Sequence, residues 1–347
     1  MAFVALVVYT VSSGDKKWFT ASSSDAQPNG IEKYSRESPF AVDCALFLNS
    51  SSDLAVLPAE NHNVHVVQAE HPFDMSLHDT EHEVISRSIN QEGCFECLIL
   101  FSLLNALKKS PDASLIDIGG NIGMYSLYAA SYGHNAITFE PMKINQEKIC
   151  QSILSNIHFQ DRITLIGAAT SDSSASKYVD FNTKGFKQAI AKKGDLNYGS
   201  GIVKEFHSEN NAPPPGDRGV HYAHSLTIDS LQGTKHLPQP GSHIVLKVDV
   251  EGSECKALLG SLIYLSTVKI DYAAIELSYV RMQQCHQDGG ALEKIFDLFT
   301  SNGLELYLSS KNEWMKVDPV NWIPWARERS AILFDIAWSK GIPNMIL

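Results

Sequence analysis

The alternation of apolar and polar residues along the chain predicts a succession of strands and helices. From residue 81 to 109, apolar residues recur at three- and four-residue steps, which predicts a helix ended by Pro111. Beyond it, short apolar runs alternate with segments of helical period. The predicted strands are 64–67, 114–118, 136–139, 162–168, 244–250, 272–277, 304–308 and 331–336, and the further helices are 124–131, 143–157, 253–265 and 290–301. This alternation indicates βαβ units and a mostly parallel sheet.

Two regions depart from the alternation. Residues 1–80 show little periodicity, so they are predicted to form an N-terminal extension to a domain at 81–347. A second irregular region, about 171–224, lies between two predicted strands and contains Pro213-Pro214-Pro215. Consecutive prolines fit neither a helix nor a central strand, which predicts a hairpin or loop insertion.

Composition narrows the class of protein. The chain has 347 residues, 44% of them hydrophobic, which is enough for one large core with an appendage or for two modest domains. Its formal net charge of -11 disfavours a nucleic-acid partner, because phosphates would be repelled. The lone Cys94-Phe95-Glu96-Cys97 motif lacks further metal ligands nearby, so buried thiols are favoured over a zinc site.

The N-terminal residues leave the compartment open. The apolar run Ala2–Thr10 is shorter than the roughly 20 residues that span a bilayer, and a secretion signal and a first β-strand both fit it. No other segment predicts firm membrane association. We expect the cytoplasm, with the secretory pathway as the alternative. The sequon at Asn49 matters only in the latter case.

A glycine-rich turn follows the predicted strand 114–118. Asp117 ends the strand, and the turn carries Gly119, Gly120, Asn121 and Gly123. In an open α/β sheet the ligand lies beyond the carboxyl ends of the strands, where glycines let the backbone approach it closely. The helix that follows offers free N–H groups to a carboxylate of the ligand.

An acid at the end of the next strand completes the pattern. Glu140 is placed to accept hydrogen bonds from both ribose hydroxyls of a nucleoside. A nicotinamide-binding G-x-G-x-x-G loop would need glycine where this chain has Asn121 and Met124. Adenosylmethionine is therefore the favoured cofactor over NAD.

Three segments together resemble the FkbM family of methyltransferases. They are Asp117–Ser126 followed by Phe139-Glu140-Pro141, then Leu226–Leu231, then Leu246–Glu254 with its K-x-D-x-E-G-x-E pattern. Asn145 and Asn156 also fall where the family tends to place asparagine, over a resemblance that covers about residues 93–280. Gly120 stands where the family usually has alanine, a change that should be harmless.

The resemblance implies a class I, Rossmann-like fold: a doubly wound, mostly parallel sheet whose last strand is antiparallel. It also implies methyl transfer from S-adenosylmethionine, typically to a hydroxyl oxygen. We expect the cofactor to be bound by Asp117, Gly119, Gly120, Asn121, Gly123, Glu140 and Asp172. Asp172 follows the strand 162–168, where class I folds often contact the adenine amino group, although a simple turn explains it equally well.

Asp249 and Glu251 are the predicted catalytic residues. They lie two positions apart after a central strand, so both side chains lean toward the same side of the site. One carboxylate would accept the proton of an acceptor hydroxyl, or both would bind acceptor hydroxyls. Glu254 is interpreted as a helix cap, and Lys247 as the partner of Asp249 or Glu276.

Other candidates carry simpler interpretations. Asp249 and Glu276 alone do not define a metal site, so no metal is predicted. His221 and His224 are interpreted as solvated loop residues rather than bases. Glu96 lies where the family tends to carry an acid, or simply faces solvent. Trp314, Trp322 and Trp325 are interpreted as loop anchors rather than as a stacking surface for the acceptor.

The sequence thus predicts a methyltransferase that acts on a hydroxyl of a small molecule or a carbohydrate. A non-catalytic protein that retains the nucleotide pocket is the first alternative, and an NAD-dependent dehydrogenase is the second. Neither the acceptor nor the oligomeric state follows from the sequence.

Overall fold

The computed structural model describes residues 40–50, 62–173, 178–182, 203–206, 220–278, 290–310, 313–318 and 333–343. Its main sheet has eight strands. These are β3 (Ser114–Ile118), β4 (Ala136–Phe139), β5 (Ile163–Ile166), β10 (His243–Val248), β11 (Lys269–Ser278), β12 (Glu305–Ser310), β13 (Glu313–Val317) and β14 (Leu333–Ser339).

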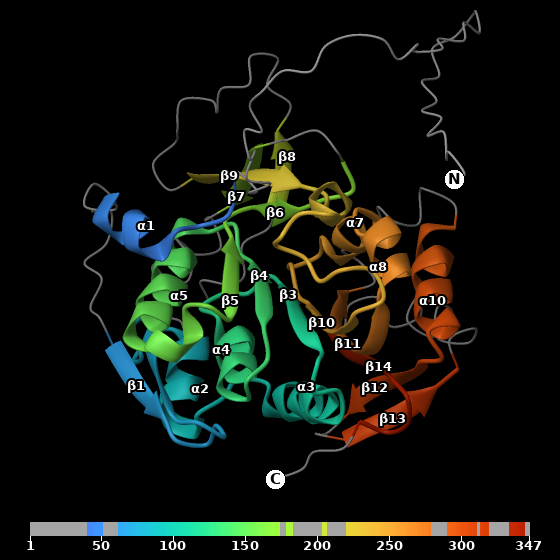
Figure 1. Cartoon of the computed structure of the whole chain (residues 1–347), viewed down its shortest axis with the longest axis horizontal. Helices are drawn as coiled ribbons and strands as arrows, with labels where there is room; N and C mark the ends of the chain where they lie inside the picture. The colour runs from blue at the N-terminus through green and yellow to red at the C-terminus, as the bar shows by residue number, and fades with distance from the viewer. Residues whose placement is uncertain are drawn as a thin grey trace, which may run out of the picture. The chain divides into compact units, whose positions relative to one another are not determined.

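The strand order of this sheet is β13-β12-β14-β11-β10-β3-β4-β5 (Figure 1). Strands β5, β4, β3, β10 and β11 are parallel, whereas β14 pairs antiparallel with both β11 and β12. The predicted parallel sheet with an antiparallel last strand is therefore confirmed. The order reverses between β3 and β10, and an open α/β sheet binds its ligand at such a switch point.

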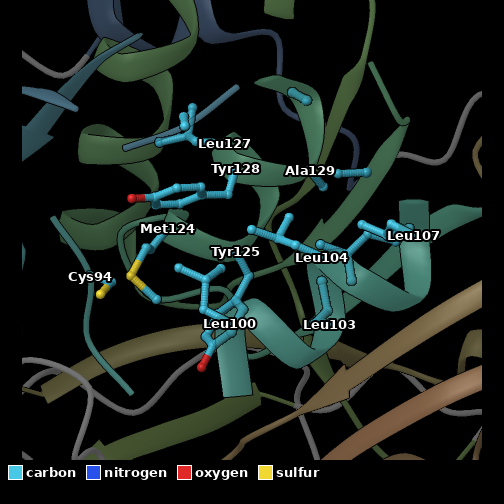
Figure 2. Packing of buried hydrophobic residues seen from close by; sticks show 14 of the residues in the cluster. Cys94, Leu100, Leu103, Leu104, Leu107, Met124, Tyr125, Leu127, Tyr128 and Ala129 are labelled. Atoms are coloured by element: carbon cyan, nitrogen blue, oxygen red, sulfur yellow. The ribbon is translucent and has the colours of Figure 1, made fainter. Parts of the chain in front are cut away.

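Helices cover both faces of the main sheet. Helices α3 (Cys97–Lys109), α4 (Met124–Ser131) and α5 (Lys143–Ser155) pack on one face, and α7 (Glu254–Leu259), α8 (Leu262–Thr267) and α10 (Ala291–Ser301) on the other. Alternate residues of β3 serve the two cores: Leu115 joins the first, whereas Ile116 and Ile118 join the second. Figure 2 shows side chains of α3 and α4 that build the first core.

Two predicted helices are each divided in the structure. The segment 81–109 forms α2 (Val84–Glu92) and α3, because Gly93 ends α2 in the left-handed region with a φ of 78°. The segment 253–265 forms α7 and α8, separated at Gly260. A side chain at Gly260 would place its Cβ 1.8 Å from the carbonyl oxygen of Ser171, so the chain can pass here only with glycine.

The segments before α2 pack on α5. They comprise α1 (Cys44–Ser50), a helix that the pattern did not predict, and a hairpin of β1 (His62–Val66) and β2 (Phe73–Leu77). Ser76 donates its N–H to the hydroxyl of Ser152 on α5 at 2.9 Å. A disulfide between Cys44 and Cys150 joins α1 to α5. The boundary near residue 80 stays a prediction.

The cysteines correct the sequence-based interpretation. Cys94 and Cys97, interpreted as buried thiols, form a disulfide with each other. Cys255 is also disulfide-bonded, and no cysteine of the described residues is free. The pattern of a helix could not reveal the bond between Cys94 and Cys97, because it depends on the left-handed conformation of Glu96, which lies between them before α3 begins.

The insertion between β5 and β10 builds a second sheet. Its strands β6 (Ala169–Thr170), β9 (Val220–Leu226), β7 (Tyr178–Asn182) and β8 (Val203–Phe206) are hydrogen-bonded in this order (Figure 1). The proline run, the apolar run 2–10 and two of the three tryptophans considered above, Trp322 and Trp325, lie outside the described residues. Among the helices described, none has the length and hydropathy needed to cross a membrane.

Candidate active site

The glycine-rich turn between β3 and α4 lies against the end of β10. Gly119 has a φ of 88°, and a Cβ on it would lie 1.7 Å from the carbonyl oxygen of Asp249. Only glycine permits this approach. Gly119 and Gly120 both donate their N–H groups to the carbonyl of Phe139, which fixes the turn across the end of β4. Gly123 begins α4 with a φ of 86°.

Asp117 lies beneath this turn and is completely buried. One carboxylate oxygen accepts a hydrogen bond from Ser126 at 2.8 Å, and the other has no partner among the described residues. Burial raises the pKa of Asp117 to about 6. Asp117 is paired in register with Lys247 of β10, so it helps hold the two strands and the turn together.

Glu140 lies at the end of β4 and is buried at the floor of the site. Its carboxylate accepts the N–H groups of Asn121 and Met142, each at 2.8 Å. Burial nevertheless raises its pKa to about 8. The hydrogen bond from Asn121 to Glu140 joins the glycine-rich turn to the predicted ribose-binding acid.

The N-terminal hairpin supports Glu140 through two side chains. The amide nitrogen of Asn145 on α5 lies 3.5 Å from Glu140, and its amide oxygen lies 2.9 Å from Nε2 of His78. His78 follows β2 and is buried, and this burial lowers its pKa to about 4. His78 is therefore a neutral donor to Asn145 at physiological pH.

A cavity opens above these groups, with about 880 Å³ of empty space, part of it open to solvent. Gly119, Asn121 and Glu140 line one side of it, and Thr170 lines another. The hydroxyl oxygen of Thr170 is buried without a hydrogen-bond partner in the described part of the chain, so a ligand can supply one.

Carboxylates from separate elements form an acid wall beside the glycine-rich turn. Oxygens of Asp249, Glu251 and Glu276 lie within 4.8 Å of one another, and so do oxygens of Glu96, Glu276 and Asp335. Asp249 and Glu251 both face the cavity, in the arrangement their spacing predicts. Glu276 is shared by the two groups and contributes from β11.

Lys247 supplies a positive charge to this wall. Its ammonium nitrogen lies 3.1 Å from Asp249 and 3.8 Å from Glu96, and 5.3 Å from the ring centre of Tyr125. Burial would lower the pKa of Lys247, but the charges of Asp249 and Glu96 outweigh burial and raise it. The predicted pairing of Lys247 with Asp249 is confirmed.

Burial raises the pKa of two other acids near Lys247. Burial, together with the charges of Asp249 and Glu251, raises the pKa of Glu276 to about 9. Burial likewise raises the pKa of Asp335 to about 6. Each group of three carboxylates has enough oxygens to contribute to a divalent-cation site. Without a cation, a proton on Glu276 reduces the negative charge of the acid wall, in agreement with its raised pKa.

Other predicted residues lie away from the cavity. Glu254 accepts the N–H groups of Val250 and Gly252 and so stabilises the turn before α7, which agrees with a capping role. Asp172 is exposed and accepts a hydrogen bond from its neighbour Ser171, so its adenine contact stays a prediction. His224 packs against Phe40, with ring centres 5.4 Å apart.

Trp314 is a buried anchor, because its ring nitrogen donates to the hydroxyl of Ser102 on α3 at 2.9 Å. Sequence reasoning missed Thr170, Tyr125 and Asp335. Thr170 belongs to a two-residue strand, and Asp335 lies in a strand whose partner could not be read from the sequence. The one sequence signal for Asp335 is that it is a charged residue within the otherwise apolar run 333–338.

A parallel sheet with its switch point at β3 and β10, a glycine-rich turn there, and a buried acid at the end of the next strand define a class I S-adenosylmethionine-dependent methyltransferase. The model of the FkbM methyltransferase domain matches residues 117–306, more than half of the chain. The chain belongs to the FkbM methyltransferase family. Comparison with curated proteins finds no match.

Solved structures that match this chain include methyltransferases of low sequence identity. FkbM from Methylobacillus flagellatus is 15% identical with a TM-score of 0.36, and the match covers 66% of this chain and 44% of that one. A SAM-dependent methyltransferase from Agrobacterium tumefaciens is 9% identical with a TM-score of 0.35, over 83% and 72% of the two chains. The N-terminal domain of human METTL16, in complex with SAH, is 11% identical with a TM-score of 0.31, over 70% and 68%. At these scores the likeness says nothing about the acceptor.

Proposed function

We propose that this protein transfers a methyl group from S-adenosylmethionine to a hydroxyl oxygen of a small molecule or a carbohydrate. The observation that carries the proposal is the wall formed by Asp249, Glu251 and Glu276 beside the glycine-rich turn. Carboxylates accept hydrogen bonds from hydroxyl groups and remove protons from them. The same wall, in a chain of net charge -11, repels the phosphates of a nucleic acid.

The residues on the other side of the cavity fit the cofactor. Glu140 is buried with two backbone donors behind it, and its carboxylate has further capacity to accept the ribose hydroxyls. The N–H groups at the start of α4 suit a carboxylate. The unpartnered hydroxyl of Thr170 suits a polar edge of the adenine. When bound, adenosylmethionine supplies an electrophilic methyl group.

We assign the acceptor side to three residues with different roles. Asp249, oriented by Lys247 at 3.1 Å, accepts the proton of the acceptor hydroxyl. Glu251 binds a neighbouring hydroxyl. Glu276, whose pKa is raised to about 9, is protonated near neutral pH and donates a hydrogen bond to an acceptor oxygen.

The first test is the substitution Asp249→Asn, which keeps the size of the side chain and removes the base. We expect the turnover number to fall about 100-fold or more, because a general base contributes about 10²–10⁴. Binding of S-adenosylhomocysteine should change little. The measurement is release of S-adenosylhomocysteine with a panel of sugars and hydroxylated small molecules, with Asp112→Asn at an exposed turn as the matched control.

Two results would count against the proposal. Full activity of Asp249→Asn would remove Asp249 as the base. Tight binding of the cofactor by the wild-type protein, with no turnover on any hydroxyl acceptor, would favour the non-catalytic binding protein instead.

A further inference from the structure

A second, smaller cavity adjoins the start of α4 and has about 380 Å³ of empty space. Gly120, Ile122 and Met124 line it on the side of the glycine-rich turn, and Glu96 lines it on the other. Glu96 also lines the larger cavity, so it lies where the two meet. The first N–H groups of a helix have no partners within the helix, and they attract a carboxylate.

The side chain of Glu96 has one oxygen available in this cavity. Tyr125 donates its hydroxyl to Oε2 at 3.1 Å, and Lys247 lies 3.8 Å from the same oxygen. In the described part of the chain, both contacts are to Oε2, which leaves Oε1 for a ligand. The side chain is 22% exposed, whereas Lys247 beside it is 2% exposed.

The charges around Glu96 favour a cation. Glu96 and Asp249 are both paired with Lys247, the basic group described there, so these three side chains carry a net negative charge. The amino-acid part of adenosylmethionine carries a carboxylate and an ammonium group on one carbon. If the carboxylate takes the N–H groups of α4, the ammonium falls on the side of Glu96.

The backbone of Glu96 is held in an unusual conformation. Its φ is 49° and its ψ is 50°, in the left-handed region that costs free energy for any residue with a Cβ. Cys94 and Cys97 flank it and form a disulfide. A disulfide across three residues restricts the backbone between its ends, so Glu96 is not free to relax.

The flanking residues also tie this segment to α4. Phe95 donates its N–H to the sulfur of Met124 at 3.3 Å, and Tyr128 donates its hydroxyl to the carbonyl of Gly93 at 2.8 Å. Cys94 belongs to the same buried cluster as Met124 and Tyr128 (Figure 2). The segment that carries Glu96 is therefore placed relative to the helix that would bind the carboxylate.

We propose that Glu96 binds the ammonium group of adenosylmethionine and that the Cys94–Cys97 disulfide holds Glu96 in the conformation needed for this contact. Glu96 touches the cofactor, and the two cysteines are positioning residues that act through it. This inference rests on the cofactor assigned above and is independent of the acceptor.

Two ligands separate this role from general support of the site. S-adenosylhomocysteine has the amino-acid part, whereas 5′-methylthioadenosine has the nucleoside and sulfur without it. In calorimetric titrations, Glu96→Gln should lower the affinity for S-adenosylhomocysteine about tenfold or more, because a charge-assisted hydrogen bond is lost. Its affinity for methylthioadenosine should stay within about twofold of the wild type.

The clamp is tested by the double substitution Cys94→Ala/Cys97→Ala. We expect a selective loss of affinity for S-adenosylhomocysteine, smaller than that of Glu96→Gln, and no further loss when the two changes are combined. Cys44→Ala/Cys150→Ala is the matched control, since it removes a disulfide of 106-residue separation at α1 and α5. The control should lower stability and leave the ratio of the two affinities unchanged.

Three outcomes would overturn the inference. Equal loss of both ligands in Glu96→Gln would mean that Glu96 supports the pocket as a whole. Unchanged binding of S-adenosylhomocysteine in this variant would refute the ammonium contact while leaving the proposed function intact. Failure of the wild-type protein to bind either ligand would refute the proposed function and this inference together.

Discussion

Glu140 is buried, although its proposed role in binding the ribose hydroxyls needs an ionised carboxylate. Its pKa is raised to about 8, chiefly by burial, so the empty site retains a proton on this side chain at neutral pH. A carboxylate that accepts two ribose hydroxyls works best without that proton. Cofactor binding should therefore release the proton, and the affinity should depend on pH through this residue.

We expect the affinity for S-adenosylhomocysteine to rise between pH 6.5 and 8.5. The sign follows from linkage. Below about pH 8 the free protein carries a proton on Glu140 that the complex lacks. The affinity therefore falls by up to roughly tenfold for each pH unit that the pH is lowered. Calorimetry at pH 6.5 in buffers of different ionisation enthalpy counts the released proton. Glu140→Gln should bind more weakly and lose this dependence; the same pH slope in that variant would assign it to another group.

At the scale of elements, the turn between β3 and α4 fits its neighbour β4 closely. A Cβ on Gly120 would lie 2.1 Å from the methyl carbon of Thr138 on β4. The family usually has alanine at this position, and this chain has glycine where Thr138 occupies the space. The hydroxyl of Thr138 lies 2.6 Å from that of Ser126, so a hydrogen bond also joins β4 to α4.

Gly120→Ala should lower the free energy of unfolding by about 1–3 kcal/mol, the usual cost of overpacking. Thr138→Ser removes the methyl group and keeps the hydroxyl, so the double variant Gly120→Ala/Thr138→Ser should recover much of the loss. Thermal unfolding of the four proteins measures this coupling. Additive effects of the two substitutions would show that the contact with Thr138 is not the cause.

At the scale of the whole molecule, the Cys44–Cys150 disulfide joins segments 106 residues apart in sequence. Disulfides of this kind form and persist in oxidising compartments. Its stabilising effect comes mainly from the restricted unfolded chain, and this effect grows with the size of the closed loop.

Cys44→Ser/Cys150→Ser should lower the free energy of unfolding by about 5 kcal/mol, the loop-entropy estimate for a loop of roughly 100 residues. The Cys94–Cys97 disulfide closes a far shorter loop, so Cys94→Ser/Cys97→Ser should lower the free energy of unfolding by less. Denaturant unfolding compares the two variants. Alkylation of the unreduced wild-type protein, followed by mass measurement, should leave all four cysteines unmodified; their modification would contradict both disulfides.

Much of the fold and the cofactor side of the site could be predicted because these features are local. Strand β3 begins and ends at the same residues in the prediction and the structure, and the glycine-rich turn follows it directly. Apolar periodicity reports which face of an element is buried, and glycine reports where the backbone needs positive φ. These constraints lie within a few residues of each other along the chain.

The acid wall and the disulfides were decided by tertiary structure alone. Glu96 is separated from both Glu276 and Asp335 by well over a hundred residues along the chain, and the pairing of β14 with β11 and the bend at Gly93 bring the oxygens of all three within 4.8 Å. By itself the sequence determined the fold class, the cofactor turn and Glu140. Which acids besides Asp249 meet Lys247, and which cysteines meet each other, depended on packing that the local pattern does not report, since that pattern contains no information about partners across the sheet.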